Sequence, residues 1–403
     1  MQFVVVVVLV VLLHVPLGDY MARVYSDAKH WRIEQVIYRL IGSEPDGQQR
    51  WTKYGYSLLA FSVVSVLFLY GLLLIQTKLP EPWGHAGMNP ALAFNTAISF
   101  VTNTSWQSYA GEATLGHVGL VAGLGVQAFA SCAVGMCVGV ALVRGLAQYQ
   151  NEQLGNFWTD LVRSIVRILL PPSIIVTLVL LALGVVNNFH GGQEVSTLAG
   201  GNQTILGGPV ATWESIKLMS GDGGGAFNVN SAHPFENPTP LTNAVEIVAM
   251  LVIPVGFLRT FGAMVGDREQ GWALFTAAAV LFVVATVAIV VATAVSHGLS
   301  EVLSAFTSSA ANNGSAFAEI SANTTWYNTA LAFAMVIGRF IPIIAVLAIA
   351  GTFAAQKPGV ITAGTLRTHS PTFIVLIVGA TLLVVGLEYL PALALGPPAD
   401  GLR

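Results

Sequence analysis

Charged residues are scarce in this sequence, which has 17 lysines and arginines and 20 aspartates and glutamates among its 403 residues. They make up 9% of the chain, whereas soluble globular proteins average about 25%. A soluble domain of this length could not cover its surface with so few charges, so lipid must solvate much of the chain. The net charge of −3 gives no sign of a nucleic-acid partner.

Cysteine is equally rare. The two cysteines, Cys132 and Cys137, lie in one apolar run without a histidine or a further cysteine at metal-ligand spacing. We therefore interpret them as small core residues rather than metal ligands. The sequence also lacks a Gly-x-x-x-x-Gly-Lys-Ser/Thr phosphate loop and a large polar domain that could hold one, so we expect that this chain binds no ATP.

Long hydrophobic runs are what the sequence has in abundance. Apolar residues are 54% of the chain, and the mean hydropathy is +0.71. A transmembrane helix needs about 20 apolar residues. Runs of that kind cover residues 2–18, 56–76, 117–142, 168–187, 243–264, 272–296, 327–352 and 372–392. We therefore expect an all-α polytopic membrane protein with about eight transmembrane helices, forming one transmembrane domain over residues 1–403.

The positions of lysine and arginine predict how these runs are oriented. No positive residue precedes the first run, whereas Arg23, Lys29 and Arg32 follow it, which is the reverse of a secretory signal peptide. With eight spans, the loops on one side carry 12 of the 17 lysines and arginines, and the loops on the other side carry 3. The remaining two, Arg259 and Arg339, fall inside spans. The positive-inside rule then places both termini outside.

Three of the outside loops have an unusual composition. Each begins with a stretch that could form a short helix, and then continues in Gly, Asn, Ser and Thr until the next apolar run. These loops cover about residues 91–112, 211–232 and 299–320. The second and third share glycine, a small residue and Ala-Phe, at residues 224–227 and 314–317. The pattern indicates a repeated unit of span, pore helix and span, as is common in transporters.

We expect these segments to be re-entrant pore loops. Backbone that is not helical at membrane depth must line a water-filled cavity, because lipid cannot satisfy its polar groups. Glycine permits left-handed backbone, so successive carbonyl groups can point the same way, and a ring of carbonyls can replace the hydration shell of a potassium ion. The alternative, which one loop alone would favour, is an ordinary outside loop with Gly and Asn turns.

At these loops the sequence resembles the potassium-binding subunit (KdpA) of the Kdp potassium-transporting ATPase, within the superfamily of potassium transporters. The matching stretches are residues 93–112, 228–239, 266–268, 315–318, 338–340, 364–366 and 390–397. The resemblance implies four span–pore loop–span repeats around a pore that accepts potassium from outside, in the bacterial plasma (inner) membrane. It also implies partners, namely a P-type ATPase catalytic subunit and small accessory membrane subunits, while this chain itself is non-catalytic.

By position, the resemblance implies a selectivity filter contributed by the three loops. The residues implied are Thr102, Asn103, Thr104, Ser105 and Gln107 in the first loop, Gly221, Asp222, Gly223, Gly224 and Gly225 in the second, and Asn312, Asn313 and Gly314 in the last. Arg339 matches the family's Gly-Arg-Phe, which implies a positive charge near the ion path. Charged residues inside spans usually face the protein interior. A structural salt bridge or a snorkelling side chain is the alternative for Arg339.

The sequence departs from the family's pattern in three places. Between Gly271 and Ser300 it has a single apolar run, where the family has a third filter loop and two further spans, so one wall of a fourfold pore is missing. Asp222 stands where the family has asparagine, which could strengthen cation binding and weaken selectivity. The last filter reads Ala-Ala-Asn-Asn-Gly, one asparagine fewer than in the family.

The leading hypothesis is therefore a pump subunit that binds extracellular potassium and passes it into the membrane. One alternative is an autonomous potassium channel or transporter, because pore loops alone could support it. Another is a non-conducting relative that keeps only its assembly contacts, which the missing repeat suggests.

Overall fold

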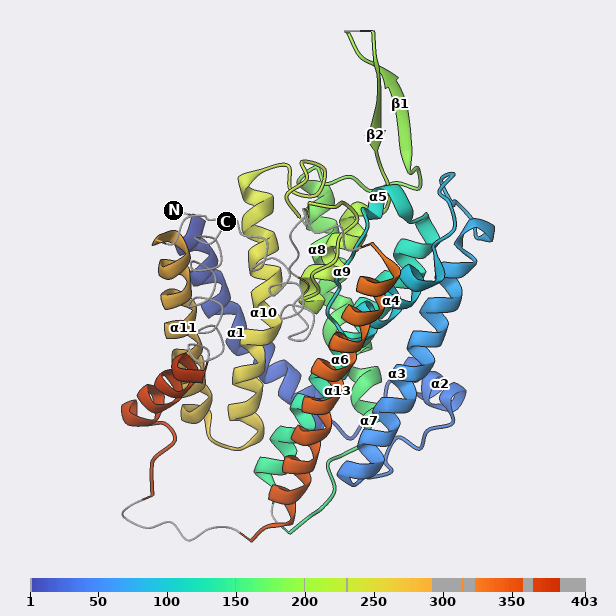
Figure 1. Cartoon of the computed structure of the whole chain (residues 1–403). Helices are drawn as coiled ribbons and strands as arrows, with labels where there is room; N and C mark the ends of the chain where they lie inside the picture. Colours follow the sequence, from blue (N-terminus) through green and yellow to red (C-terminus); the bar gives the residue numbers. More distant parts are fainter. Residues whose placement is uncertain are drawn as a thin grey trace, which may run out of the picture.

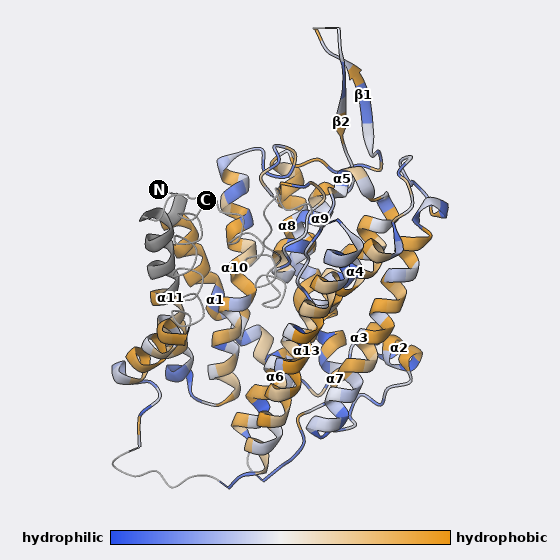
Figure 2. Ribbon diagram, in the orientation of Figure 1, coloured by the Kyte–Doolittle hydropathy of each residue, from blue (hydrophilic) through white to orange (hydrophobic). Residues whose placement is uncertain are grey.

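The computed structural model describes residues 2–148, 150–198, 200–229, 231–291, 314, 323–357 and 365–384. These residues form a bundle of long helices, with short helices and loops packed among them (Figure 1). Figure 2 shows that the long helices are mostly hydrophobic along their length. The all-helical, multi-span fold class predicted from the apolar runs is thereby confirmed.

Six helical segments of the described chain are long and apolar enough to cross a membrane. They are α1 (Gln2–Ser26), α3 (Trp51–Leu74), α6 (Val126–Ala147) with the π-helical η2 (Gly119–Gly125) before it, the continuous segment α7 (Phe157–Arg163), η3 (Ser164–Leu169) and α8 (Leu170–Ala182), α10 (Pro240–Met264) and α13 (Thr325–Ala355). The helix α11 (Arg268–Val291) and a shorter apolar helix at Pro371–Val384 lie where the other two spans are expected. Eight as the number of spans stays a prediction.

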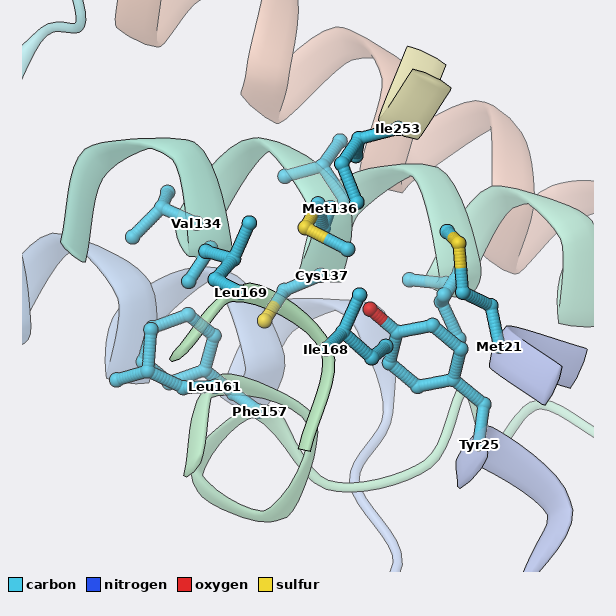
Figure 3. Packing of buried hydrophobic residues seen from close by; sticks show 14 of the residues in the cluster. Met21, Tyr25, Val134, Met136, Cys137, Phe157, Leu161, Ile168, Leu169 and Ile253 are labelled. Carbon is cyan, nitrogen blue, oxygen red and sulfur yellow. The ribbon is translucent and has the colours of Figure 1, made fainter. Parts of the chain in front are cut away.

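The helix α6 lies at the centre of the bundle. Of its apolar stretch, together with η2, 72% is buried inside the protein, against 39% or less in the other five long segments. Cys137 of α6 is fully buried and packs with Met21, Tyr25 and Phe157, as Figure 3 shows. The interpretation of Cys137 as a core residue is confirmed.

One predicted boundary is wrong. The span expected at residues 168–187 begins earlier, at Phe157, because the polar residues of its first turns are buried and paired inside the bundle. Asp160 accepts hydrogen bonds from both terminal nitrogens of Arg144, at 2.6 and 2.9 Å, and from the Tyr54 hydroxyl at 3.0 Å. Arg167 pairs with Glu34 of the amphipathic helix α2 (Arg32–Ile41). A hydropathy average assigns these charged residues to a loop in water, whereas in the fold their charges are buried and paired with opposite charges.

The helix α1 packs closely along α10. Gly18 and Gly256 make this approach possible, since a Cβ on Gly18 would lie 2.5 Å from the Gly256 carbonyl oxygen. Arg259, which the sequence places inside a span, forms a bidentate ion pair with Asp19 of α1, at 2.8 and 3.1 Å. The charge in the span is therefore compensated by the neighbouring helix.

A β-hairpin is the one departure from an all-α fold among the described residues. The strands β1 (Gly192–Ser196) and β2 (Asn202–Leu206) pair antiparallel, with Gly192 opposite Leu206, and project from the bundle (Figure 1). Sequence reasoning missed them because both strands are exposed on both faces and show no alternation of apolar and polar residues. The N-terminal end of α1 lies at the same end of the bundle as the hairpin, and α2 lies toward the other end.

Replacing Asp160 with alanine should destabilise the protein strongly, because the Arg144 guanidinium then stays buried without its carboxylate. Removing one partner of a buried ion pair costs about 3–5 kcal/mol. The exposed pair of Arg50 and Glu152, at 2.8 Å, provides a matched control, and Glu152→Ala should cost less than about 1 kcal/mol. Thermal unfolding of the detergent-solubilised variants measures both changes. Equal melting temperatures for the two variants would contradict this assignment.

Candidate functional site

The short helix α4 (Pro90–Val101) enters the bundle from the end that carries the hairpin (Figure 1). Its first turn is capped by the Asn89 side chain, which accepts a hydrogen bond from the Ala91 amide at 2.9 Å, and Pro90 occupies the first turn. Its last two turns are buried. The helix lies where the sequence predicts the pore helix of the loop at residues 91–112. It is preceded by η1 (Gln76–Lys78) and followed by α5 (Gly111–Thr114).

The second predicted pore helix is α9 (Val210–Ser220). It ends in a Schellman motif, in which the Asp222 amide donates to the Lys217 carbonyl at 3.0 Å and the Gly221 amide donates to the Leu218 carbonyl at 3.3 Å. Gly221 has a φ of 64°, a conformation that glycine adopts without strain. The chain thereby turns sharply and delivers residues 222–225 beside the C-terminal end of the helix.

The backbone of the first predicted filter loop contains two left-handed residues that are not glycine. Asn103 and Ser105 have φ values of 57° and 58°. The amides of Thr104 and Ser105 both donate to the Ser99 carbonyl, at 2.9 and 3.2 Å. Such conformations cost about 1–2 kcal/mol each for a residue with a Cβ, and they cluster at functional sites. Left-handed residues that alternate with ordinary ones turn successive carbonyl groups toward one side.

The first and second loops meet directly. The Gly225 amide donates to the Gln107 side-chain oxygen at 3.1 Å. Gly224 lies against the ring of Phe100, where a Cβ would come within 2.7 Å of a ring carbon. The Asn228 amide donates to the Glu112 carboxylate at 3.0 Å. The C-terminal ends of α4 and α9 therefore converge on the same place.

The third predicted loop is represented by Gly314 alone, because Asn312 and Asn313 lie outside the described residues. Gly314 has a φ of 75° and sits so close to the Thr104 carbonyl oxygen that a Cβ would collide with it. The first loop thus contacts both the second loop and the described residue of the last one. Described residues from three distant parts of the sequence thus lie close together.

Asp222 brings a carboxylate into this meeting point. Asp222 is 6% exposed, and one of its carboxylate oxygens accepts a hydrogen bond from the Gly223 amide at 3.0 Å. The other oxygen, Oδ2, has no hydrogen-bond partner within the described part of the chain, and the same holds for the buried Ser105 hydroxyl. Buried polar groups without partners are costly. Oxygen atoms of carbonyls, hydroxyls and a carboxylate are the donor set that suits an alkali cation.

Arg339 lies on α13, inside the bundle against α6. Its Nη2 atom donates to the Ser131 carbonyl at 3.1 Å, and the Ser131 hydroxyl donates to the Asn103 side chain at 2.9 Å. Arg339 is thus connected to the first filter loop through one residue. Where the structure describes side chains, Arg339 forms no ion pair with a carboxylate, in contrast to Arg144 and Arg259.

Sequence reasoning missed a group of charged residues behind the second loop. Glu214, Lys217, Glu236 and Glu246 are all at least 97% buried and lie between α9, the segment after the filter, and α10. The signal was present, since Glu214 and Lys217 are three residues apart on one helix face. The sequence predicts only a pore helix in an outside loop for this stretch.

The sequence model of the family described as "KdpA: Potassium-transporting ATPase A subunit" matches residues 4–295 and 290–402 of this chain. The potassium-transporting ATPase potassium-binding subunit of Mycolicibacterium vanbaalenii is 42% identical, over 98% of this chain and 98% of its own length. The subunits of the same name from Clavibacter michiganensis and Streptomyces coelicolor are 39% and 40% identical, over 98% and 97% of this chain and 98% and 96% of their own lengths.

These comparisons also locate an interruption in the chain. The alignment with the Mycolicibacterium protein runs over 542 positions, whereas this chain has 403 residues, so the relative contains a long stretch without a counterpart here. The two matched parts of the family model meet at residues 290–295. That junction lies inside the stretch between Gly271 and Ser300, where the third filter repeat is expected and missing.

Asn103→Ala should destabilise the protein more than Asn103→Gly. Both changes remove the hydrogen bond from Ser131, but alanine also meets the left-handed φ of 57° with a Cβ. We expect the alanine variant to be less stable by about 1 kcal/mol, after the greater unfolded-state entropy of glycine is allowed for. Thermal unfolding in detergent measures the difference. A glycine variant as unstable as the alanine variant would show that backbone strain has no part in this loop.

Proposed function

We propose a potassium filter at the meeting point of α4 and α9, on the premise that the chain belongs to the KdpA family and is the potassium-binding, non-catalytic subunit of a Kdp potassium-transporting ATPase. Potassium is the transported substrate. The filter consists of residues 102–105 and Gln107, residues 221–225, and residues 312–314. ATP binds elsewhere in the complex, on the catalytic subunit.

One observation carries this proposal, namely that the first loop contacts both others at the ends of two pore helices. Gln107 holds Gly225 through a hydrogen bond, and Gly314 lies against the Thr104 carbonyl. The C-terminal end of a helix carries about half a negative elementary charge. Two such ends together with the surrounding oxygen atoms favour a dehydrated monovalent cation at this place.

The arrangement of the loops also bears on the missing repeat. In a ring of four repeats, the first member has the second and the fourth as neighbours, and the third lies opposite to it. The first loop here contacts residue 225 of the second loop and residue 314 of the last. We infer that the last loop is the fourth member of the ring, and that the missing wall is the one opposite the first loop.

Two charged side chains tune the site in this proposal. Asp222, with one carboxylate oxygen unpartnered among the described residues, strengthens the attraction for cations and relaxes the choice among them. Arg339, connected through Ser131 to Asn103, supplies a positive charge beside the path that the ion takes after the filter. It thereby favours release of the ion from the site over tight retention.

The chain is a subunit of the Kdp complex, and other Kdp subunits are therefore its partners. We propose that these are a P-type ATPase catalytic subunit and small accessory membrane subunits, and that the complex lies in the bacterial inner membrane. The N-terminus lies outside, because the loops on that side carry few lysines and arginines. The whole chain, residues 1–403, forms one transmembrane domain in this proposal.

Growth at micromolar potassium tests the filter. The host is a strain without its own potassium uptake systems that carries this chain together with the other pump subunits. Gly224→Ala should abolish growth, because the new Cβ would push Phe100 and the filter backbone apart. Gly71→Ala is the matched control: it lies in α3 with no atom within 4 Å of the added Cβ, so growth should be unchanged.

The same experiment separates the competing functions. Growth that both glycine variants support equally would sink the proposed filter. Potassium flux in liposomes that contain only this chain would favour the autonomous channel or transporter. A chain that inserts and co-purifies with the other subunits but supports no growth would be the non-conducting relative.

Cysteine labelling tests the proposed orientation. Leu198 at the tip of the hairpin is fully exposed, and the Asp46 side chain, in the loop before α3, is 87% exposed. On intact cells, a membrane-impermeant maleimide should label Leu198→Cys, and it should label Asp46→Cys only after the membrane is permeabilised. The opposite pattern would refute the outside N-terminus.

A further inference from the structure

Five residues behind the second filter loop form a buried polar cluster, which we call the filter clamp. Glu214 and Lys217 belong to α9, Ser231 and Glu236 follow the filter, and Glu246 belongs to α10. The four charged members are between 0% and 3% exposed. Burying ionisable groups costs free energy, which the hydrogen bonds within the cluster must offset.

The first half of the clamp joins the pore helix to the chain that leaves the filter. Lys217 donates to the Ser231 hydroxyl and, at 3.2 Å, to the Glu214 carboxylate. The Ser231 hydroxyl donates in turn to the other Glu214 oxygen at 2.5 Å. Ser231, which is left-handed with a φ of 69°, is thereby fixed against α9.

The second half of the clamp holds the end of the filter itself. The two oxygens of Glu236 accept hydrogen bonds from the Phe227 amide at 3.3 Å and from the Ser231 amide at 3.0 Å. The filter stretch 222–226 is thus suspended between two anchors. At its start the Asp222 amide donates to the Lys217 carbonyl, and at its end the Phe227 amide donates to Glu236.

The clamp contains three carboxyl groups and one ammonium group. Burial, and after it the negative charge of Glu214, raise the pKa of Glu236 to about 7. Glu246 faces the other members of the cluster, and its Oε1 atom has no hydrogen-bond partner within the described part of the chain. Lys217 is the one positively charged member of the clamp, and its loss would remove the hydrogen bonds to Glu214 and Ser231.

We propose that the filter clamp is a specificity-determining device: it fixes the spacing of the second loop's carbonyl groups, and so the preference for potassium over other monovalent cations. This inference rests on the proposed filter. Potassium and rubidium differ little in radius, so small shifts of the ligating carbonyls change their relative binding. Glu236 and Lys217 are positioning residues, because they act through the backbone at residues 222–227 and do not touch the ion.

The test uses the assembled pump and its cation-stimulated ATPase activity, measured with potassium and with rubidium. Glu236→Gln retains the size of the side chain but has one acceptor oxygen in place of two. The backbone amide of either Phe227 or Ser231 would then face the NH2 group of glutamine and lose its hydrogen bond. We expect the ratio of the rubidium KM to the potassium KM to fall about tenfold, since a lost hydrogen bond to a charged group is worth that much. The kcat at saturating potassium should change by less than about twofold.

Arg259→Met is the matched control. It breaks the ion pair between Arg259 of α10 and Asp19 of α1, outside the filter clamp. It should lower the melting temperature without changing the rubidium-to-potassium ratio. If Glu236→Gln does not assemble, the double change Glu214→Gln with Lys217→Met removes both partners of a buried pair, which is usually tolerated. That variant is expected to show the same fall in the ratio.

The outcomes distinguish this inference from the function on which it rests. If the unaltered pump responds to no cation, the proposed filter fails and the clamp's role fails with it. If the pump prefers potassium and the clamp variants keep the same ratio, the clamp inference is overturned and the filter stands. A ratio that falls equally in Arg259→Met would also overturn it, because the effect would then follow from lost stability alone.

Discussion

Backbone that is not helical cannot face lipid, and this constraint governs the centre of the molecule. The backbone polar groups of the predicted filter loops have to find their partners inside the protein. The first loop meets this need through Ser99, whose carbonyl accepts two amides, and the second through Gln107 and Glu236. The loops are therefore held by one another and by the helices around them, and this is why they meet at one place.

The same constraint sorts the charges of the bundle into two groups. Arg144 and Arg259 each pair with a carboxylate on a neighbouring segment, which makes them compatible with the membrane interior. Asp222 and Arg339 have no such partner in the described part of the chain, and both lie near the place where a cation is proposed to bind.

The missing repeat gives this family member an unusual architecture. The family model is matched in two parts that meet at residues 290–295. The Mycolicibacterium relative, which aligns with 98% of this chain, is considerably longer than the chain itself. The retained loops still contact one another, because the first loop is the neighbour of both others. The filter clamp is complete without the missing repeat, since all of its members lie between Glu214 and Glu246. The contacts of Glu236 with the second loop therefore form without the missing repeat.

The sequence by itself determined the membrane class, the family and the positions of the short helices α4 and α9, because apolar length and Gly-rich motifs are local properties. It also located the interruption after Gly271. It did not predict where α7 begins, the exposed hairpin or the clamp, because these depend on partners far away in the chain. The charge of Arg144 is compensated only beside Asp160, and Glu236 contacts the end of the second loop only because the chain folds back to Phe227. The cost of burying a charge depends on what surrounds it, and only the tertiary structure decides that.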